Sequence, residues 1–352
     1  NTQRIPDGTT VGYTISGITL ADISDPTSLT GNFTVTNQTD TFDVDTEINN
    51  DAYILVLAQE NSDYGVYRYT ANSDLSSPQL LNSLLTDTQA LGMYFKSDGS
   101  LLFLQDAVND EFIRYTFTGA PDPDQWNLIP TGSSTTASYG TVGGNHQGMW
   151  ISNAGTTLFQ VDRDIKYILQ DTISSWDPLN PGSPSRFLDI SSTATLPSGI
   201  SVKPDGTKAF VSCLSGPSAI LEYSGTAFEC NTWTLTNTLS ISSDFPSDVF
   251  VTDAGTEMYV TSDGSKIYYY ILSTPWDLST ASLNNTWDLS ATYDNIYAVY
   301  VARPTAEVFN ITLDATDSLG NNTGNRSKSA LIITAPTPGQ SVYRGNLESS
   351  NQ

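Results

Sequence analysis

Apolar and polar residues alternate along most of the chain, in short runs that are separated by tight-turn residues. Four segments show this most clearly, each with one alternating run, then Asp-Gly or Ala-Gly, then a second run. They are residues 92–105 (GMYFKSDGSLLFLQ), 148–161 (GMWISNAGTTLFQV), 199–212 (GISVKPDGTKAFVS) and 248–261 (DVFVTDAGTEMYVT). A period of two predicts β-strands, and Gly supplies the positive φ that a tight turn needs. Each segment is therefore predicted to be a β-hairpin.

A third alternating run follows each hairpin, and it ends in a three-residue motif: an apolar residue, then any residue, then Tyr. The copies are Tyr67-Arg-Tyr69, Ile113-Arg-Tyr115, Ile165-Lys-Tyr167, Leu221-Glu-Tyr223 and Ile267-Tyr-Tyr269. The first and last of these tyrosines are 200 residues and four intervals apart, so the mean period is 50 residues. A later aromatic residue is expected to mark a fourth strand, at Trp126, Phe187, Trp233 and Trp287. Four strands in a repeat of this length predict the blade of a β-propeller.

The two ends of the repeat region predict how the ring closes. Residues 52–58 (AYILVLA) resemble a second strand without its first strand, and residues 297–302 (YAVYVA) resemble a first strand without its second. Pairing residues 297–302 with residues 53–58 would close a five-bladed ring and remove the exposed sheet edges. A six-bladed ring is the alternative, in which residues 41–45 supply a first strand and residues 308–312 a second.

The flanks favour five blades, because neither carries the blade pattern. Both alternate apolar and polar residues, as strands of a β-sandwich do. With the runs GTTVGYTISG, LTGNFTV and FNITLDATDSLG, they resemble one Calx-β or immunoglobulin-like module cut in two. We therefore expect an all-β protein with a split sandwich (residues 8–50 plus 303–335), an inserted propeller (residues 51–302) and a C-terminal extension (residues 336–352). Two separate small β elements are the alternative for the flanks.

The charge of the chain excludes some partners. Its 38 acidic and 14 basic residues give a net charge of −24, which repels the phosphates of nucleic acids. No run approaches the roughly 18 apolar residues of a membrane span. We therefore expect neither nucleic-acid binding nor insertion into a membrane.

Candidate catalytic and metal-binding residues are scarce. His146 is the only histidine, so a site with several histidines is excluded; its glycine-rich surroundings place it near the central channel, where packing is the expected role. A glycosidase needs two carboxyl groups about 5.5 Å or 6.5–9.5 Å apart, but Asp248 is the only acid at the starts of the inner strands. We predict no catalytic residues, no metal site and no cofactor, and hence a protein that is not an enzyme.

Other polar and aromatic residues have ordinary explanations beside functional ones. Asp98 and Asp205 precede turn glycines, and we interpret them as turn residues rather than cation ligands. Trp176 and Trp276 lie in the loops between third and fourth strands. They are the candidates for ligand binding, with packing against their own blades as the alternative. The sequence leaves open whether Cys213 and Cys230 pair. It also leaves Asp314 and Asp317 of the second flank without an assigned metal.

The segment 271–282 (ILSTPWDLSTAS) carries a family resemblance, with weaker echoes at residues 172–179 (TISSWDPL) and 73–77 (SDLSS). It resembles a repeat in the structural proteins of tailed bacteriophages, especially marine ones. The resemblance implies a non-enzymatic virion protein on the exterior of the particle, as a tail-fibre or appendage component or a capsid decoration. It implies roles in host attachment or assembly, in many copies or as a homo-oligomer, with other virion proteins and a host-surface glycan as partners. The alternative is a secreted or cell-surface carbohydrate-binding propeller, and a glycosidase is less favoured.

Overall fold

The computed structural model is all-β. It describes residues 52–302, apart from 73–74, 87, 107, 120–125, 139–144, 180–183, 216–217 and 242–243, and the backbone of four further strands outside that range. The chain divides into two compact units, one formed by residues 51–303 and the other by residues 1–50 with 304–352.

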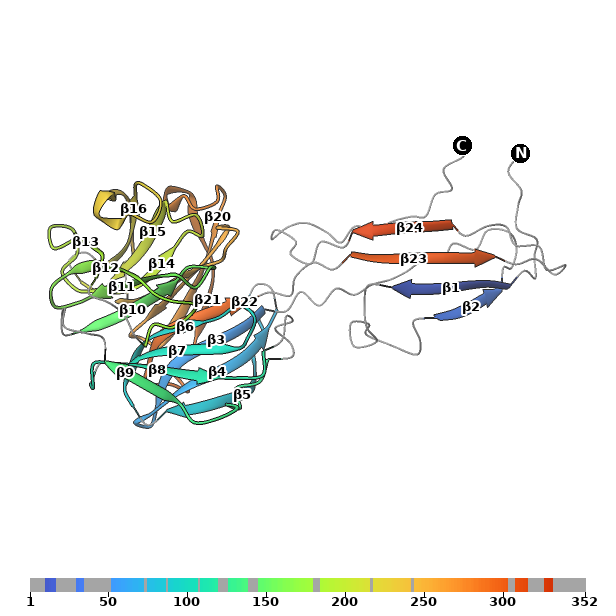
Figure 1. The fold of residues 1–352 in the computed structure, drawn as a ribbon, viewed down its shortest axis with the longest axis horizontal. Coiled ribbons are helices and arrows are strands. Elements are labelled where there is room, and N and C mark those ends of the chain that lie inside the picture. Colours follow the sequence, from blue (N-terminus) through green and yellow to red (C-terminus); the bar gives the residue numbers. More distant parts are fainter. Residues whose placement is uncertain are drawn as a thin grey trace. The chain divides into compact units, whose positions relative to one another are not determined.

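Residues 52–302 form five four-stranded antiparallel sheets, which confirms the five-bladed propeller (Figure 1). We name the strands of each blade A to D, in the order of each list below. Blade 1 holds β22 (Asn295–Ala302), β3 (Ala52–Glu60), β4 (Asp63–Ala71) and β5 (Gln79–Thr86). Blade 2 holds β6 (Ala90–Phe95), β7 (Leu101–Asp106), β8 (Glu111–Thr116) and β9 (Thr135–Ser138). Blade 3 holds β10 (His146–Ile151), β11 (Thr157–Asp162), β12 (Tyr167–Thr172) and β13 (Arg186–Asp189). Blade 4 holds β14 (Pro197–Val202), β15 (Lys208–Cys213), β16 (Ala219–Ser224) and β17 (Thr234–Ser240). Blade 5 holds β18 (Pro246–Val251), β19 (Glu257–Ser262), β20 (Lys266–Leu272) and β21 (Ala281–Asp288).

The A strands form the innermost ring of the propeller. Strand β6 contacts β10, and the contacts continue through β14, β18 and β22 back to β6. Two 3-10 helices, η3 (Cys230–Thr232) and η4 (Leu278–Thr280), lie in the loops between C and D strands of blades 4 and 5.

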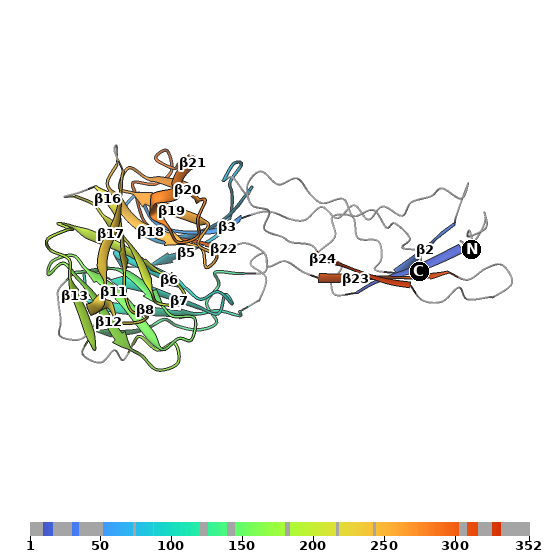
Figure 2. The ribbon, with the colours of Figure 1, turned by 90° about the horizontal axis from the view of Figure 1, so that it is seen from above.

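The ring closes as the sequence predicts, because the last strand of the propeller pairs with its first. Strands β22 and β3 are antiparallel neighbours, with Ala302 opposite Tyr53 and Ala298 opposite Leu57, and they lie side by side in both views (Figures 1 and 2). Buried aromatic residues reinforce the junction between blades 5 and 1; the Tyr69 and Trp287 rings meet edge to face with centroids 4.9 Å apart. Closure therefore combines backbone pairing with a cluster of large side chains.

The flanks come together in one antiparallel sheet, in the order β2 (Thr30–Thr34), β1 (Thr10–Ser16), β23 (Val308–Ala315), β24 (Arg326–Leu331). Since β23 pairs with β1 and β24, residues 308–312 do not supply a strand of a sixth blade. Residues 41–45, Asp317 and residues 336–352 lie outside the described residues. The sandwich and its Calx-β or immunoglobulin-like character remain predictions.

A glycine forms the turn between strands A and B in four blades, as predicted. Gly99, Gly155, Gly206 and Gly255 all have positive φ, between 66° and 73°. Each lies under an aromatic ring from the C–D loop of its own blade: Trp126, Trp176, Phe228 and Trp276, respectively. A Cβ atom on Gly255 would lie 1.9 Å from Cδ1 of Trp276, so a side chain there has no room. This contact gives the Trp-Asp segments of the repeat a structural role.

Two details of the predicted repeat are wrong. The tyrosine of the third strand holds equivalent positions at Tyr69, Tyr115 and Tyr223, opposite Ile54, Leu102 and Ala209. In blades 3 and 5 that position belongs to Asp171 and Tyr270 instead of Tyr167 and Tyr269. The turns before the C strands differ in length. A fixed spacing from the hairpin to the Tyr therefore misplaces this residue by one or more positions. Trp126 and Trp233 precede β9 and β17 rather than lying in them, because both side chains pack in the C–D loop region.

Side chains of one blade reach the C–D loop of the next blade. The carboxylate of Glu222, which is 1% exposed, accepts hydrogen bonds from Lys208 Nζ at 2.7 Å and from the backbone N–H of Leu278 at 3.0 Å. Gln170 similarly donates to the carbonyl oxygen of Phe228 at 2.7 Å and accepts from the N–H of Cys230 at 3.0 Å. These hydrogen bonds satisfy buried polar groups and join blade 3 to blade 4 and blade 4 to blade 5.

Candidate functional site

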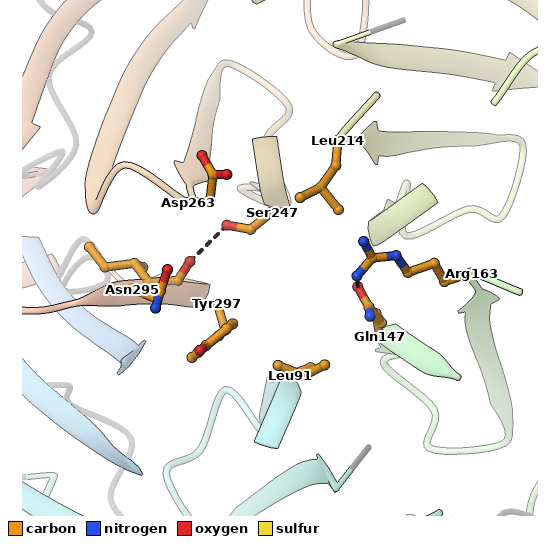
Figure 3. Close-up of a pocket in the computed structure, with 9 residues that line it drawn as sticks. Leu91, Gln147, Arg163, Leu214, Ser247, Asp263, Asn295 and Tyr297 are labelled. Carbon is orange, nitrogen blue, oxygen red and sulfur yellow. Dashed lines mark hydrogen bonds between the residues drawn. The ribbon is translucent and has the colours of Figure 1, made fainter. Parts of the chain in front are cut away.

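A small pocket lies at one end of the propeller axis. Antiparallel order puts the A–B and C–D turns at one end of each blade, and the B–C turns and D-to-A connections at the other. The pocket, of about 80 Å³, lies at this second end, and all five blades contribute to it (Figure 3). Its lining consists of Leu91, Gln147, Arg163, Leu214, Ser247, Asp263, Asn295, Ile296 and Tyr297.

A β-bulge near the start of every A strand shapes this end of the axis. In each blade the pairing of A with B skips one residue; the skipped residues are Leu91, Gln147, Ser198, Ser247 and Tyr297. A bulge re-aims the side chain of its unpaired residue. Four of the five re-aimed side chains line the pocket, so a repeated backbone irregularity presents a different residue from each blade.

The A strands approach one another closely next to these bulges. A Cβ atom on Gly148 would lie 2.5 Å from Cα of Gly199, and one on Gly199 would lie 2.2 Å from the Oδ1 atom of Asp248. Only residues without side chains fit at the first two positions. The inner strands are therefore packed against each other beside the pocket.

Asp248 is the one acid among the predicted starts of the inner strands, and it is buried. Its Oδ2 atom accepts a hydrogen bond from the backbone N–H of Val299, on the neighbouring A strand, at 3.3 Å. Burial raises the pKa of this carboxyl from 3.8 to about 8, in spite of its backbone hydrogen bonds. Asp248 does not line the pocket, so it acts within the packed ring rather than on a ligand.

Two charged residues of opposite sign line the pocket. Arg163 comes from the B–C turn of blade 3, and its Nη1 atom donates to Oε1 of Gln147 at 3.4 Å. Asp263 comes from the B–C turn of blade 5 and is exposed; partial burial, together with the charge of Asp244, raises the pKa of its carboxyl. The pocket therefore offers one cation and one acid from different blades.

The remaining polar groups of the pocket are neutral and already oriented. The Ser247 hydroxyl donates to the carbonyl oxygen of Ile296 at 2.8 Å. Asn295 Nδ2 and the Tyr297 hydroxyl donate to Oε1 of Gln59 at 3.3 and 3.0 Å. Figure 3 shows Asn295 and Tyr297 on one side of the pocket and Arg163 with Gln147 on the other. Such fixed polar groups suit hydrogen bonding to a polar ligand.

His146 begins β10 at this end of the propeller, but it does not line the pocket. The residue is 2% exposed, and Nε2 lies 3.6 Å from Oδ2 of Asp162 on the adjacent strand. Burial lowers the pKa of the imidazole, and the nearby carboxylates only partly oppose that effect. The expected packing role fits this position.

Trp176 and Trp276, the candidates for ligand binding, lie at the A–B end and not in the pocket. Trp276 is 3% exposed, and its Nε1 atom donates to the carbonyl oxygen of Asp253 at 3.3 Å. Trp176 is half-buried, and Nζ of Lys96 lies 5.1 Å from its ring centroid. Each ring also covers the turn glycine of its blade, so both positions favour the packing interpretation.

The other predicted turn and cysteine residues have local roles. Oδ1 of Asp98 and Oδ1 of Asp205 accept hydrogen bonds from the backbone two residues later, at 3.0 and 2.9 Å, as turn aspartates do. Cys213 and Cys230 are both buried free thiols. Within the described part of the chain there is no group of three or more His, Cys, Asp or Glu side chains that could hold a metal ion. The described residues likewise include no helix that is long and apolar enough to cross a membrane.

No known protein family matches this chain, and no curated protein is similar to it. Among solved structures, a functionally unknown protein from Desulfotomaculum acetoxidans is 16% identical, with a TM-score of 0.40 over 79% of this chain and 89% of that one. A chain of a nidogen–laminin complex is 10% identical, with a TM-score of 0.44 over 78% and 92%. A putative 6-phosphogluconolactonase from Bacteroides uniformis is 11% identical, with a TM-score of 0.38 over 94% and 98%. At these values the likenesses carry no argument about activity.

Sequence reasoning missed the pocket residues, Arg163 above all. The skipped residues of the five bulges share no chemistry, so no repeated motif marks them. A signal did exist for Arg163, because it is one of only 14 basic residues and lies two residues after the predicted hairpin 148–161, in the turn before a third strand.

Proposed function

We propose that this chain is a non-enzymatic structural protein on the exterior of a tailed-phage particle, and that its propeller presents a recognition face. The proposal for the virion rests on the resemblance of the 271–282 segment to repeats of phage structural proteins. Tail fibre, appendage and capsid decoration are the candidate locations. Other virion proteins and a host-surface glycan are the proposed partners.

The chemistry of the axial pocket is the observation that supports recognition rather than catalysis. Its polar lining consists of amide, hydroxyl and guanidinium groups with a single carboxyl group, that of Asp263. Hydrolysis of a glycosidic bond uses two carboxyl groups. Hydrogen-bonding groups fixed on a rigid scaffold are sufficient for binding, and many copies on one particle would add avidity to a weak contact.

A secreted or cell-surface carbohydrate-binding protein is the second candidate. The same pocket favours it, because amides and hydroxyls beside apolar side chains are typical of sites for polar ligands. The two candidates differ in the location of the protein and not in the chemistry of the pocket.

Purified particles would distinguish them. We expect mass spectrometry of a tailed phage whose genome encodes this chain to find it in stoichiometric amounts, and antibodies against residues 51–303 to label the particle exterior. Absence from the particle, with the protein found in the culture medium or on a cell surface, would favour the second candidate. Steady hydrolysis of a polysaccharide by the pure protein would contradict both.

A further inference from the structure

We infer that the axial pocket binds the carboxylate of an acidic sugar, with Arg163 as the group that recognises its charge. This assignment rests on the proposed function in one respect, since it takes the pocket to be a recognition site. It adds the chemical class of the ligand and the residue that selects it.

The pairing of basic residues in the propeller points to Arg163. Of the nine basic side chains among the described residues of the propeller, six lie within 4.0 Å of a carboxylate: Lys96, Arg114, Arg186, Lys203, Lys208 and Lys266. Arg68 lies over the ring of Tyr53 and Lys166 donates to the carbonyl oxygen of Asp164, and neither lines the pocket. Among the described residues no carboxylate lies that close to the guanidinium of Arg163, whose side-chain partner is the neutral amide of Gln147. In a chain with a net charge of −24, this leaves an uncompensated cation facing a pocket. The planar fork of Arg matches a carboxylate with two parallel hydrogen bonds.

Gln147 holds this cation in place. It is 5% exposed, its Nε2 atom donates to Oδ1 of Asn145 at 2.9 Å, and its Oε1 atom accepts from Arg163. The amide is thus oriented with its oxygen toward the guanidinium. An Arg that is positioned before binding loses less conformational freedom when the ligand arrives.

The rest of the lining fits a hydroxylated molecule better than a simple anion. The carboxyl group of Asp263 and the amide oxygen of Asn295 can accept hydrogen bonds from hydroxyl groups, while Leu91 and Leu214 offer apolar contact to carbon atoms. Asp263 repels every anion, but it repels a dianion such as phosphate about twice as strongly as the single charge of a carboxylate, which Arg163 alone can match. An acidic sugar combines one carboxylate with several hydroxyl groups and apolar C–H faces.

The size of the pocket sets how much of the sugar enters. A volume of about 80 Å³ holds roughly five to eight water-sized groups. That is enough for a carboxylate and the neighbouring carbon and hydroxyl atoms. Since Asp263 is exposed, the pocket opens to solvent, and the remainder of a longer glycan can extend outward.

Calorimetric titration of the whole chain with D-glucuronate, D-galacturonate, D-glucose and inorganic phosphate tests the inference. We expect at least one of the two uronates to bind, at least tenfold more tightly than glucose and phosphate. Arg163→Gln should weaken that binding at least tenfold, and Arg163→Lys, which keeps the charge without the fork, should give an intermediate loss. Arg186→Gln is the matched control, because Arg186 pairs with Glu229 outside the pocket, and it should bind as the unchanged protein does.

Three results would overturn the inference: no binding of either uronate, equal binding by the Arg163→Gln variant, or phosphate binding as tight as uronate binding. Melting curves check that each variant is folded. If Arg163→Gln does not fold, the comparison of Arg163→Lys with the unchanged protein decides the question. Failure of the proposed virion location would appear only in the particle experiment, so the two proposals are tested separately.

Discussion

The buried carboxyl group of Asp248 is expected to make the free energy of unfolding depend on pH. Burial raises its pKa from 3.8 to about 8 in the folded protein. Between those values the folded state keeps a proton that the unfolded chain releases. The stabilisation is therefore complete below about pH 4 and is lost as the pH rises to about 8. The loss is on the order of a few kcal/mol.

The substitution Asp248→Asn, which stays neutral at every pH, tests this. Urea unfolding should show the unchanged protein losing stability between pH 5 and pH 8, and the variant losing clearly less. Asp171, whose pKa burial raises to about 6, contributes the same slope to both proteins and cancels in the comparison. Parallel pH profiles for the two proteins would contradict the role given to Asp248.

Gly255 is expected to tolerate no side chain. Its φ is +73°, and Cδ1 of Trp276 occupies the space that a Cβ atom would need. Gly255→Val should lower the free energy of unfolding by about 1–3 kcal/mol from backbone strain alone. Gly132 is the control, because a Cβ atom at this position would have no neighbouring atom within 4 Å. Gly132→Val should leave the melting temperature nearly unchanged. Equal melting of both variants would show that the turn geometry is misinterpreted.

Trp276 is expected to stabilise the fold and not to bind a ligand. Because its ring is buried over Gly255, Trp276→Ala should cost about 3–5 kcal/mol. Trp176→Ala should cost less, since that ring is half-buried. Thermal melting measures both effects beside an attachment assay. Lost attachment at an unchanged melting temperature would instead support recognition by these tryptophans.

Among the strands, β22 is expected to be the most sensitive to interruption. Its Val299 lies opposite Val56 of β3 and donates its N–H to Asp248 of β18, so it joins three strands. Val299→Pro removes that donor and should cost about 3 kcal/mol or more. Ser133→Pro, in an exposed loop, is the control. Amide exchange in β3 should accelerate only in the Val299 variant; exchange spread evenly over all blades would argue against a special role for this strand.

At the scale of the elements, the sequence predicted the hairpins and the pairing of residues 297–302 with residues 53–58, and it favoured five blades over six. These features depend on local alternation, on turn glycines and on one unmatched strand at each end. The position of Asp171 was not predictable, because the length of the B–C turn decides which residue of β12 faces Leu158. Arg163 and Gln147 meet only because a bulge in β10 and a turn after β11 converge at the axis, and neither leaves a spacing in the sequence.

For the whole molecule, the propeller is expected to fold without its flanks. Residues 51–303 form a compact unit whose first and last strands pair with each other. This segment should be expressed as a soluble fragment and unfold in one cooperative transition in urea, with the midpoint close to that of the propeller in the whole chain. A fragment that aggregates, or that lacks β-sheet circular dichroism, would show that the flanks are needed to hold the ring together.

Because the two ends of the propeller pair with each other, β3 remains without its inner partner during most of the synthesis of the chain. Strand β3 ends at residue 60 and β22 begins at residue 295, so 234 residues (61–294) lie between them. A ribosome adds about 5–20 residues per second, so the inner edge of β3 stays unpaired for on the order of 10–50 seconds before β22 is synthesised. The waiting strand begins with AYILVLA, an uncharged apolar run that is prone to pair with other chains. Slower translation should therefore increase aggregation of the nascent protein, and chaperones that shield exposed strands should raise its yield.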